Sequence, residues 1–313
     1  MKLFDQVLAD GLLASGQPVV VMLSGGRDST CLLDVTVRIA GAQAVSALHV
    51  NYGLRDAAEE DERHCAALCS ALGVVLEVRR PRRAGGTGAG NLQAWARDER
   101  YGAAAQIAEA RFADVAAGHT ATDQVETILY RLASSPSRRA LLGMKPREGR
   151  LIRPLLGCAR AQTAEYCMER GLKWREDASN ESDAYARARV RAKLVPALRE
   201  IHPGAERNVL ALADILRDEG EVLDHLVAEV LQGGDEVSLV RLRELPSALA
   251  ALVVQRLADQ AAGDPAPGTA RRVHEILALD RGALDLPHGV RAVARDGRLH
   301  FERTPALTRR GLG

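Results

Sequence analysis

The feature that most constrains this chain is a glycine turn directly after a short β-branched run. The run Val19–Met22 is typical of a buried strand, and Leu23 then leads into Ser-Gly-Gly-Arg-Asp-Ser at 24–29. From Ser29 onward the apolar residues have the spacing of an α-helix. The glycines therefore stand where a strand passes into a helix N-terminus, whose free backbone N–H groups and dipole can hold an anion.

The residue types in this turn suit a phosphate group. Glycines permit positive φ and let the backbone approach oxygen atoms closely, and serine hydroxyls add donors. Asp28 is expected to hold a Mg²⁺ that bridges phosphates, and because no Gly-Lys-Ser/Thr follows, the turn is not a Walker loop. Taken alone, the turn is equally compatible with a plain glycine turn capped by Asp and Ser. The predicted phosphate-binding residues are Ser24, Gly25, Gly26, Arg27, Asp28 and Ser29.

Bulk composition favours a folded cytoplasmic protein of two domains. The chain has 313 residues, of which 47% are hydrophobic, and a net charge of +1. No apolar run approaches the roughly 20 residues of a membrane span, and the first residues lack the pattern of a signal peptide. The five cysteines include no C-x-x-C pair, which favours structural thiols over a metal or redox site.

Strands alternate with helices through the first half, which predicts an α/β fold with a doubly wound parallel sheet and ligands at the carboxyl ends of its strands. A domain boundary is expected near residue 205, giving domains 1–205 and 206–313, the second smaller and mainly helical. The expected strands are 19–23, 45–50, 74–78 and 112–116, and the expected helices are 29–40, 57–72, 92–110 and 122–132. A glycine-rich linker at 83–90 is expected to precede a helix whose N-cap is Asn91. Further helices are expected at 185–232, with a break at 202–204, and at 245–261 and 269–279, and β-like segments are expected at 283–301.

Polar motifs follow the second strand and open the next helix. His49 and Asn51, with Gly53, suit the base and ribose edge of a nucleotide, although an Asn-containing turn explains them equally well. Arg97 and Arg100 lie three apart and therefore share a helix face. That face can meet a phosphate or carboxylate, or can be charge-paired locally.

Two carboxylates open the helix after the fourth strand. Asp123 and Glu126 are three apart, near the positive end of the helix dipole that stabilises their ionised forms. Such a pair can hold Mg²⁺, bind an ammonium group or accept a proton, and first-turn acids are also common for dipole reasons alone. A basic helix with Arg187, Arg189 and Arg191 follows later.

The ordered set of motifs resembles the tRNA(Ile)-lysidine synthetases, a family of PP-loop (N-type) ATP pyrophosphatases. The resemblance covers about residues 15 to 205 strongly and the stretch 284–290 faintly. Several positions depart from the family pattern: Thr122 replaces the first of two adjacent acids, Thr120 and Tyr52 stand where His is usual, and a Ser-Pro loop replaces a glycine-rich one. The stretches that carry it are 24–29, 49–55, 96–101, 118–127, 143–144, 153–156 and 176–191.

This resemblance implies a ligase that uses ATP, with Mg²⁺, to join free L-lysine to C2 of the wobble cytidine of tRNA(Ile) with anticodon CAU. An adenylated cytidine is the implied intermediate, and AMP and pyrophosphate are the products. Asp123 and Glu126 would hold the lysine ammonium and receive its proton, and Arg97 and Arg191 would contact phosphate or the adenylated intermediate. The implied C-terminal domain binds tRNA, and a homodimer is compatible with the family.

Two other readings stay open at the level of sequence. A tRNA thiolase of the same superfamily shares the adenylation step, although it usually needs catalytic cysteines or an iron–sulfur site. A non-catalytic tRNA-binding relative would explain Thr122 and the Ser-Pro loop, but it does not explain the intact loop at 24–29.

Overall fold

The computed structural model describes residues 2–53, 58–82, 92–135, 138–175 and 186–304, and these divide into two units, residues 1–213 and 214–313. Some predicted features lie outside the described residues. They are the glycine linker at 83–90, the N-cap Asn91 and the part of the 176–191 motif up to residue 185. Among the described helices, none is both long and apolar enough to cross a membrane.

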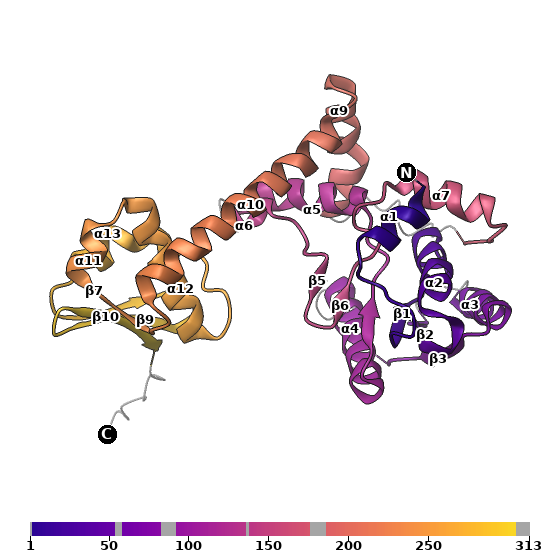
Figure 1. The fold of residues 1–313 in the computed structure, drawn as a ribbon, viewed down its shortest axis with the longest axis horizontal. Helices are drawn as coiled ribbons and strands as arrows, with labels where there is room; N and C mark the ends of the chain where they lie inside the picture. Colours follow the sequence, from indigo (N-terminus) through magenta and orange to yellow (C-terminus); the bar gives the residue numbers. More distant parts are fainter. Residues whose placement is uncertain (1, 54–57, 83–91, 136–137, 176–185, 305–313) are drawn as a thin grey trace. The chain divides into compact units, whose positions relative to one another are not determined.

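The first unit is built on a six-stranded sheet with the order β3-β2-β1-β4-β6-β5 (Figure 1). Five strands are parallel and β5 pairs antiparallel with β6, so the predicted parallel sheet is confirmed. The strands are β1 (Val19–Met22), β2 (Val45–Val50), β3 (Val75–Arg79), β4 (Asp114–Ala116), β5 (Arg147–Glu148) and β6 (Leu151–Ile152).

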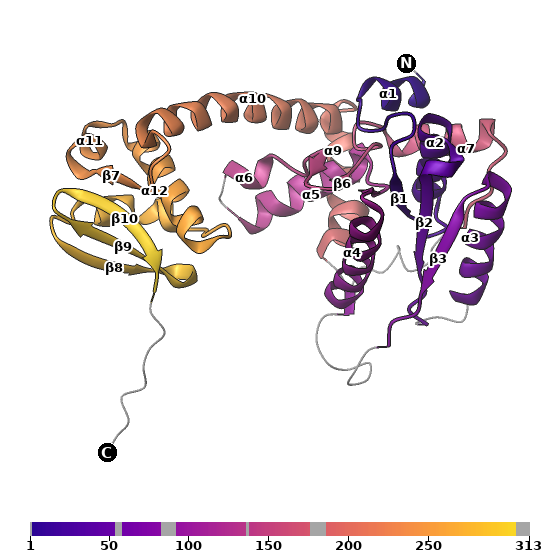
Figure 2. The ribbon, with the colours of Figure 1, turned by 60° about the horizontal axis from the view of Figure 1, so that its bottom comes forward.

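Helices cover both faces of this sheet because side chains alternate along its strands. Val19 and Val21 pack in a core with residues of α1 (Leu3–Ala9), α2 (Arg27–Ala40), α3 (Ala58–Leu72) and α7 (Arg160–Glu169). Val20 and Met22 pack on the opposite face with residues of α4 (Leu92–Arg111). Figure 2 shows β1, β2 and β3 between α4 on one side and α2 and α3 on the other. The sheet is therefore doubly wound.

The remaining helices of the first unit follow β4 and α7. They are α5 (Ala121–Ser134), α6 (Arg138–Leu141), α8 (Ala186–Arg189), a π-helical turn η3 (Val190–Leu194), α9 (Val195–Ile201) and the start of α10 (Ala205–Leu231). Val209 and Leu210 of α10 pack against a small core of α5 and η3 residues. Because the first turns of α10 belong to this core, the division between the two units falls inside α10, after residue 213, and the predicted domain boundary near residue 205 stays a prediction.

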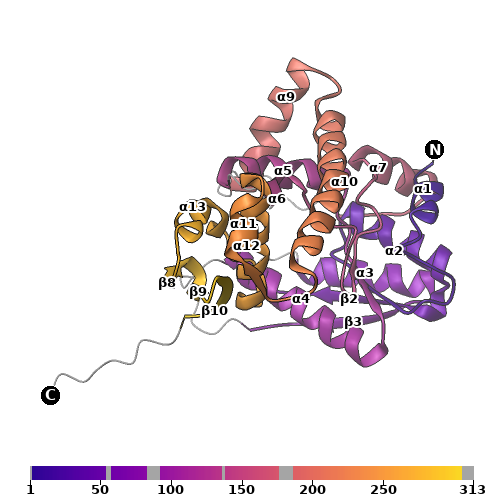
Figure 3. The same cartoon turned by 60° about the vertical axis from the view of Figure 1, so that its left-hand side comes forward.

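The second unit packs helices on a four-stranded antiparallel sheet with the order β7-β10-β9-β8 (Figure 3). Its apolar core joins Leu257 and Val253 of α12 to Leu299 and Ala292 of the sheet. The unit is mainly helical, as predicted, and the β-like end of the chain forms three of the four strands. The elements are β7 (Glu236–Ser238), α11 (Leu239–Glu244), α12 (Ser247–Ala262), η4 (Thr269–Arg272), α13 (Val273–Leu277), β8 (Gly282–Leu286), η5 (Pro287–Gly289), β9 (Val290–Arg295) and β10 (Arg298–Arg303).

Candidate active site

The predicted phosphate loop connects β1 to the N-terminus of α2, at the carboxyl edge of the parallel sheet. Gly25 adopts φ +84°, a left-handed conformation that glycine adopts without strain. The hydroxyl of Ser29 donates to the Gly26 carbonyl at 2.9 Å and lies 3.1 Å from the hydroxyl of Ser24. These bonds fix the turn locally, and they set the first backbone N–H groups of a 14-residue helix at its open end.

A second loop, after β4, lies directly against the phosphate loop. A Cβ on Gly118 would lie 3.2 Å from the carbonyl carbon of Asp28 and 3.2 Å from the amide nitrogen of Ser29. Only a residue without a side chain permits this approach of two backbones. The two predicted motifs, 24–29 and 118–127, are thereby joined in one site at the sheet's carboxyl edge, as the topology predicts.

Asp28 is surrounded by donors from α7, which the sequence analysis did not anticipate. The Thr163 hydroxyl donates to Asp28 Oδ1 at 2.5 Å, and Arg27 Nε lies 3.2 Å from the same oxygen. Arg160 Nε lies 3.4 Å from Oδ2. Two guanidinium groups therefore already offset the charge of this carboxylate.

The protein alone does not form a metal centre at Asp28. Within the described part of the chain, no group of three or more His, Cys, Asp or Glu side chains is placed to hold a metal ion. Magnesium is usually bound through one or two carboxylates together with substrate phosphates, and the Asp28 carboxylate already has two guanidinium groups beside it. Magnesium at Asp28 therefore stays a prediction.

The end of β2 supports the loop through its backbone. His49 is buried, and its Nδ1 lies 2.9 Å from the carbonyl oxygen of Leu23, immediately before the loop. Asn51 is also buried; its side-chain amide donates to Glu62 at 2.9 Å and its Oδ1 accepts from the Gly53 backbone N–H at 2.9 Å. His49 thus touches the loop and not an open surface, whereas Asn51 forms the Asn-containing turn that was one of its two predicted roles.

The two predicted carboxylates and two arginines form a compact cluster (the acid–arginine cluster: Asp123, Glu126, Arg187 and Arg191). Glu126 is fully buried, and it accepts from Arg191 Nε at 2.6 Å and from Arg191 Nη2 at 3.0 Å. Arg187 Nε lies 3.5 Å from Glu126 Oε2. The π-helical turn begins directly after α8, and Arg191 lies in its first residues. Such turns are frequent at functional sites.

Asp123 has one oxygen committed to the fold and one open to a ligand. The backbone N–H and the hydroxyl of Thr120 both donate to its Oδ2 at 2.8 Å. Its Oδ1 has only longer contacts, 3.6 Å to Arg187 and 3.7 Å to Arg191. Burial alone would raise the pKa of Asp123, but the Thr120 N–H, the Arg187 charge and the Thr120 hydroxyl together hold the pKa below its usual value.

His119 lies between the same groups. Burial lowers its pKa to about 4, against the opposing charge of Asp123 and with the help of Arg153, Arg187 and Arg97. Its Nδ1 is buried, and no other described residue provides a hydrogen-bond partner for it. The imidazole is therefore neutral at neutral pH and has an unused polar atom beside the acid–arginine cluster.

Arg97 lies further along the edge, on α4, and it is exposed. Its guanidinium carbon lies 4.6 Å from the ring centroid of Tyr101. The Tyr52 hydroxyl, just after β2, donates to the Ala96 carbonyl of α4 at 2.6 Å, which places this part of α4 at the carboxyl end of β2.

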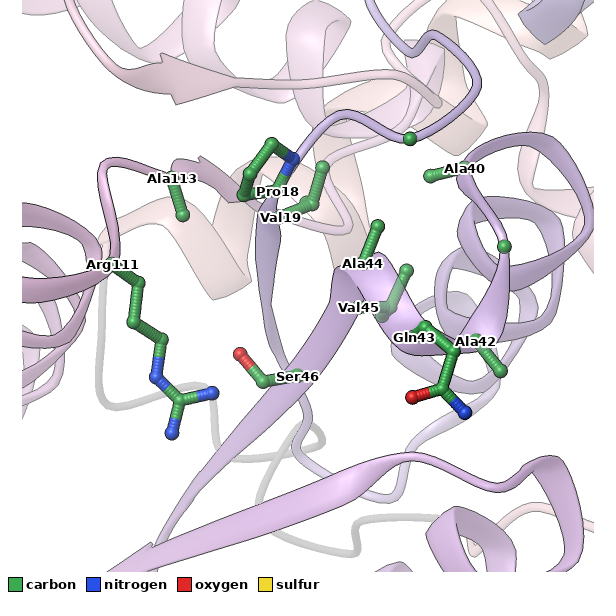
Figure 4. A pocket seen from close by; sticks show the side chains of 12 residues that line it. Pro18, Val19, Ala40, Ala42, Gln43, Ala44, Val45, Ser46, Arg111 and Ala113 are labelled. Atoms are coloured by element: carbon green, nitrogen blue, oxygen red, sulfur yellow. The ribbon is translucent and has the colours of Figure 1, made fainter.

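A separate pocket of about 540 Å³ opens at the other edge of the sheet (Figure 4). Its lining includes Pro18 and Val19 at the start of β1 and Ser46 at the start of β2. Arg111 is the charged residue of its lining and pairs with Glu77 at 3.8 Å. This pocket lies at the amino ends of β1 and β2 and takes no part in the site described above.

Comparison with known proteins agrees with this architecture. A family model described as a PP-loop domain matches residues 2–198. A tRNA(Ile)-lysidine synthase from Leifsonia xyli subsp. xyli is 34% identical over 306 residues, which cover 92% of this chain and 91% of that relative. The chain belongs to the tRNA(Ile)-lysidine synthase family.

Other members of the lysidine synthase family are longer than this chain. Relatives from Symbiobacterium thermophilum and Solibacter usitatus are each 36% identical; the matches cover 96% and 81% of this chain but only 68% and 59% of the relatives. Among solved structures, the U34-tRNA thiolase NcsA from Methanococcus maripaludis aligns with a TM-score of 0.57 at 16% identity, covering 69% of this chain and 78% of that one. That likeness shows a common fold.

The structure adds residues that sequence reasoning missed. Thr120, treated only as a departure from the lysidine synthase pattern, anchors Asp123. Arg187 contacts both carboxylates of the acid–arginine cluster. Thr163 and Arg160 contact Asp28 from α7, a helix that was not predicted. The sequence carried only a weak signal for α7, the apolar spacing of Thr163, Tyr166 and Cys167, all of which are buried.

Proposed function

We propose that this chain ligates L-lysine to C2 of the wobble cytidine of tRNA(Ile) with anticodon CAU, with cleavage of ATP to AMP and pyrophosphate. The observation that carries the proposal is the close packing of the 24–29 loop against the 118–120 loop. Through it, an anion-binding helix N-terminus and a buried carboxylate–arginine cluster share one edge of the sheet. A nucleotide-activating group and an amine-binding group are what such a ligation needs.

In the first step, the cytosine O2 attacks the α-phosphorus of ATP, and the bond to pyrophosphate breaks. The departing pyrophosphate gains negative charge, which the N-terminal amides of α2 and the hydroxyl of Ser24 are placed to stabilise. Arg27 and Arg160 add positive charge at the same end of α2. The base comes from a single-stranded loop, so presenting it requires little unpairing.

In the second step, the ε-amine of lysine attacks C2 and AMP leaves with the C2 oxygen. The amine has a solution pKa of roughly 10.4, so it arrives as an ammonium group and must lose a proton. Asp123 Oδ1 is the carboxylate oxygen of the acid–arginine cluster that lacks a short hydrogen bond, and we assign it the ammonium. Its lowered pKa suits ion pairing better than proton acceptance, so we assign Asp123 the binding role, and the proton of the ammonium passes to water.

Glu126 and Arg191 have a coupled role in this proposal. Both oxygens of Glu126 are used by Arg191, so Glu126 is poorly placed to hold an ammonium in addition. We infer that Glu126 orients Arg191, whose remaining N–H groups face the leaving phosphate. The sequence predicted that both carboxylates hold the lysine ammonium. We now assign that role to Asp123 alone.

Membership of the family also suggests what the protein binds and where it acts. We infer that the second unit contacts the tRNA, that the protein acts in the cytoplasm, and that a homodimer is compatible with activity. ATP binding at the PP-loop is implied by the family model. A magnesium ion would arrive with the ATP phosphates.

The rival function of a tRNA thiolase finds no supporting observation. All five cysteines lie in described parts of the chain and all are buried. Burial raises the pKa of Cys65 and Cys158 to about 12 and that of Cys69 to about 11, which disfavours the thiolate that sulfur transfer requires. A hydrogen bond with Cys31 lowers the pKa of Cys167, but that side chain too is buried.

The proposal is tested by incubating the purified protein with ¹⁴C-lysine, ATP and unmodified tRNA(Ile) of anticodon CAU. We expect acid-precipitable label in the tRNA that requires ATP, and none with elongator tRNA(Met) of the same anticodon. ATP-dependent binding of tRNA without any lysine incorporation would contradict the proposed function.

A further inference from the structure

A second pocket, of about 440 Å³, lies beside the active site between the end of β2 and the start of α4. Its volume falls in the range of small-molecule sites. The residues that line it are Tyr52, Gln93, Ala94, Ala96, Arg97 and Arg100. Its lining thus combines one aromatic ring with two guanidinium groups, and none of the described residues that line it is a carboxylate.

The aromatic ring of this pocket is held in place. The Tyr52 hydroxyl donates to the Ala96 carbonyl at 2.6 Å, and its ring meets that of Trp95 edge to face with centroids 5.7 Å apart. The preceding turn is fixed by the bond from Gly53 N–H to Asn51 Oδ1. Burial raises the pKa of Tyr52, so the phenol stays neutral. A rigid, neutral ring of this kind is a stacking platform for a base.

The two arginines are oriented but not neutralised. Their guanidinium carbons lie 4.6 Å (Arg97) and 5.6 Å (Arg100) from the centroid of Tyr101. Among the ion pairs between described residues, neither arginine has a carboxylate partner. A guanidinium held against a ring keeps its outer N–H groups for an anion, and phosphate matches their geometry.

We propose that this pocket binds one nucleotide of the anticodon loop, adjacent in the RNA to the cytidine that reacts. The proposal rests on the proposed function above. Tyr52 stacks on the base, and Arg97 and Arg100 bind the phosphates on either side of it. The pocket lies at the carboxyl end of β2, the strand whose His49 contacts the Leu23 carbonyl just before the phosphate loop, so it opens on the same edge of the sheet as the active site. The loop at 24–29 is assigned the phosphates of ATP. A stacked base flanked by two arginines matches a nucleotide within RNA, which has a phosphate on each side, whereas the base of ATP has phosphates on one side only.

Tyr52 stands where the family resemblance places a histidine, and the larger ring adds a stacking face at the carboxyl end of β2. RNA modules that read single strands stack unpaired bases on such rings.

The test is binding of a fluorescein-labelled anticodon stem-loop RNA to the full chain, by anisotropy, without ATP or lysine. Base stacking is worth about 1–3 kcal/mol per base, so we expect Tyr52→Leu to weaken binding by about tenfold and Tyr52→Phe by less than about twofold. Arg100→Gln should weaken binding and reduce the slope of log K against log salt by about 0.7. Arg111→Gln, on the same helix but paired with Glu77 at the far end, is the matched control.

An abasic nucleotide placed on the 5′ or the 3′ side of the wobble position identifies the occupant. On one side the lesion should weaken wild-type binding by about tenfold and leave Tyr52→Leu binding unchanged, because the stack is already lost. Calorimetric titration with ATP alone should give the same Kd for wild type and Tyr52→Leu.

Three results with Tyr52→Leu would overturn the pocket assignment. The variant could bind the RNA as tightly as wild type, or it could lose ATP binding while its RNA binding stays intact. It could also lose RNA binding and ATP binding equally, which would indicate collapse of the turn. Because the assay contains no ATP or lysine, a failure of lysine transfer would leave its result standing, and the two proposals fail separately.

Discussion

Replacement of Glu126 by Gln probes the acid–arginine cluster most sharply. The side chain keeps its size, but one acceptor oxygen becomes an NH₂ group that faces a guanidinium. In the wild type both oxygens are used, at 2.6 Å and 3.0 Å from Arg191 nitrogens, and the side chain is fully buried. The substitution therefore removes one charge-assisted hydrogen bond and leaves Arg191 without its full counter-charge.

The expected loss can be sized from that geometry. Breaking a buried ion pair costs about 3–5 kcal/mol, and a hydrogen bond to a charged group contributes about 1.5–3 kcal/mol. The Arg191 side chain is 30% exposed, so water offsets part of the loss, and we expect about 2–3 kcal/mol. In the first unit, which has 213 residues, this loss in the free energy of unfolding corresponds to a fall in Tm of about 5–10 °C.

Differential scanning calorimetry of the full chain at pH 7 measures this change. Glu169→Gln is the matched control in the same unit, because Glu169 is 52% exposed and contacts Lys2 only at 3.7 Å. That control should change stability by less than about 0.5 kcal/mol. Equal melting temperatures for Glu126→Gln and the control would refute the reasoning, since they would mean that the buried pair contributes nothing.

Three further predictions concern the same edge of the sheet. Asp123→Asn should raise the KM for lysine by about tenfold or more and leave pyrophosphate release from ATP and tRNA largely intact, because it removes only the ammonium's partner; an unchanged lysine KM would contradict the assignment. Gly118→Ala should raise the KM for ATP by about tenfold, measured by pyrophosphate exchange, because its Cβ would displace the backbone at Asp28 and Ser29; unaltered ATP use would contradict the packing described. In the folded protein the pKa of His119 is lowered to about 4, from an ordinary value near 6.5. Between these two pH values the unfolded chain binds more protons than the folded chain, so the stability should fall as the pH drops from about 6.5 to about 4. His119→Gln should flatten that part of a pH–Tm profile, and an equally steep profile in the variant would count against the buried neutral imidazole.

The parallel sheet was predictable because its central strands, β1 and β2, are buried on both faces. Val19–Met22 contains no polar residue, as expected for a buried strand, and the glycine turn that follows marks the end of the strand. The helix at 121–134 was predictable from its first-turn acids and apolar spacing. Local signals of this kind survive folding because they depend on neighbours in the chain.

The parts that were not predictable depend on contacts between distant residues. Thr163 meets Asp28 across 135 positions, and Arg191 meets Glu126 across 65. No local pattern reports such pairs. For that reason the sequence did not show that Asp28 and Arg191 each lie in an ion pair. The contact of the His49 ring with the loop backbone was not predicted either. The predicted roles of these residues toward magnesium, phosphate and the nucleotide stay predictions.

The measurement that tests the central claim most directly is mass spectrometry of the wobble nucleoside. Unmodified tRNA(Ile) of anticodon CAU is incubated with the protein, ATP, Mg²⁺ and lysine, then digested to nucleosides. The account predicts that the wobble cytidine gains the mass of one lysine less one water, and that omitting either ATP or lysine abolishes the gain. An unmodified cytidine, with ATP and lysine present and the tRNA bound, would contradict it.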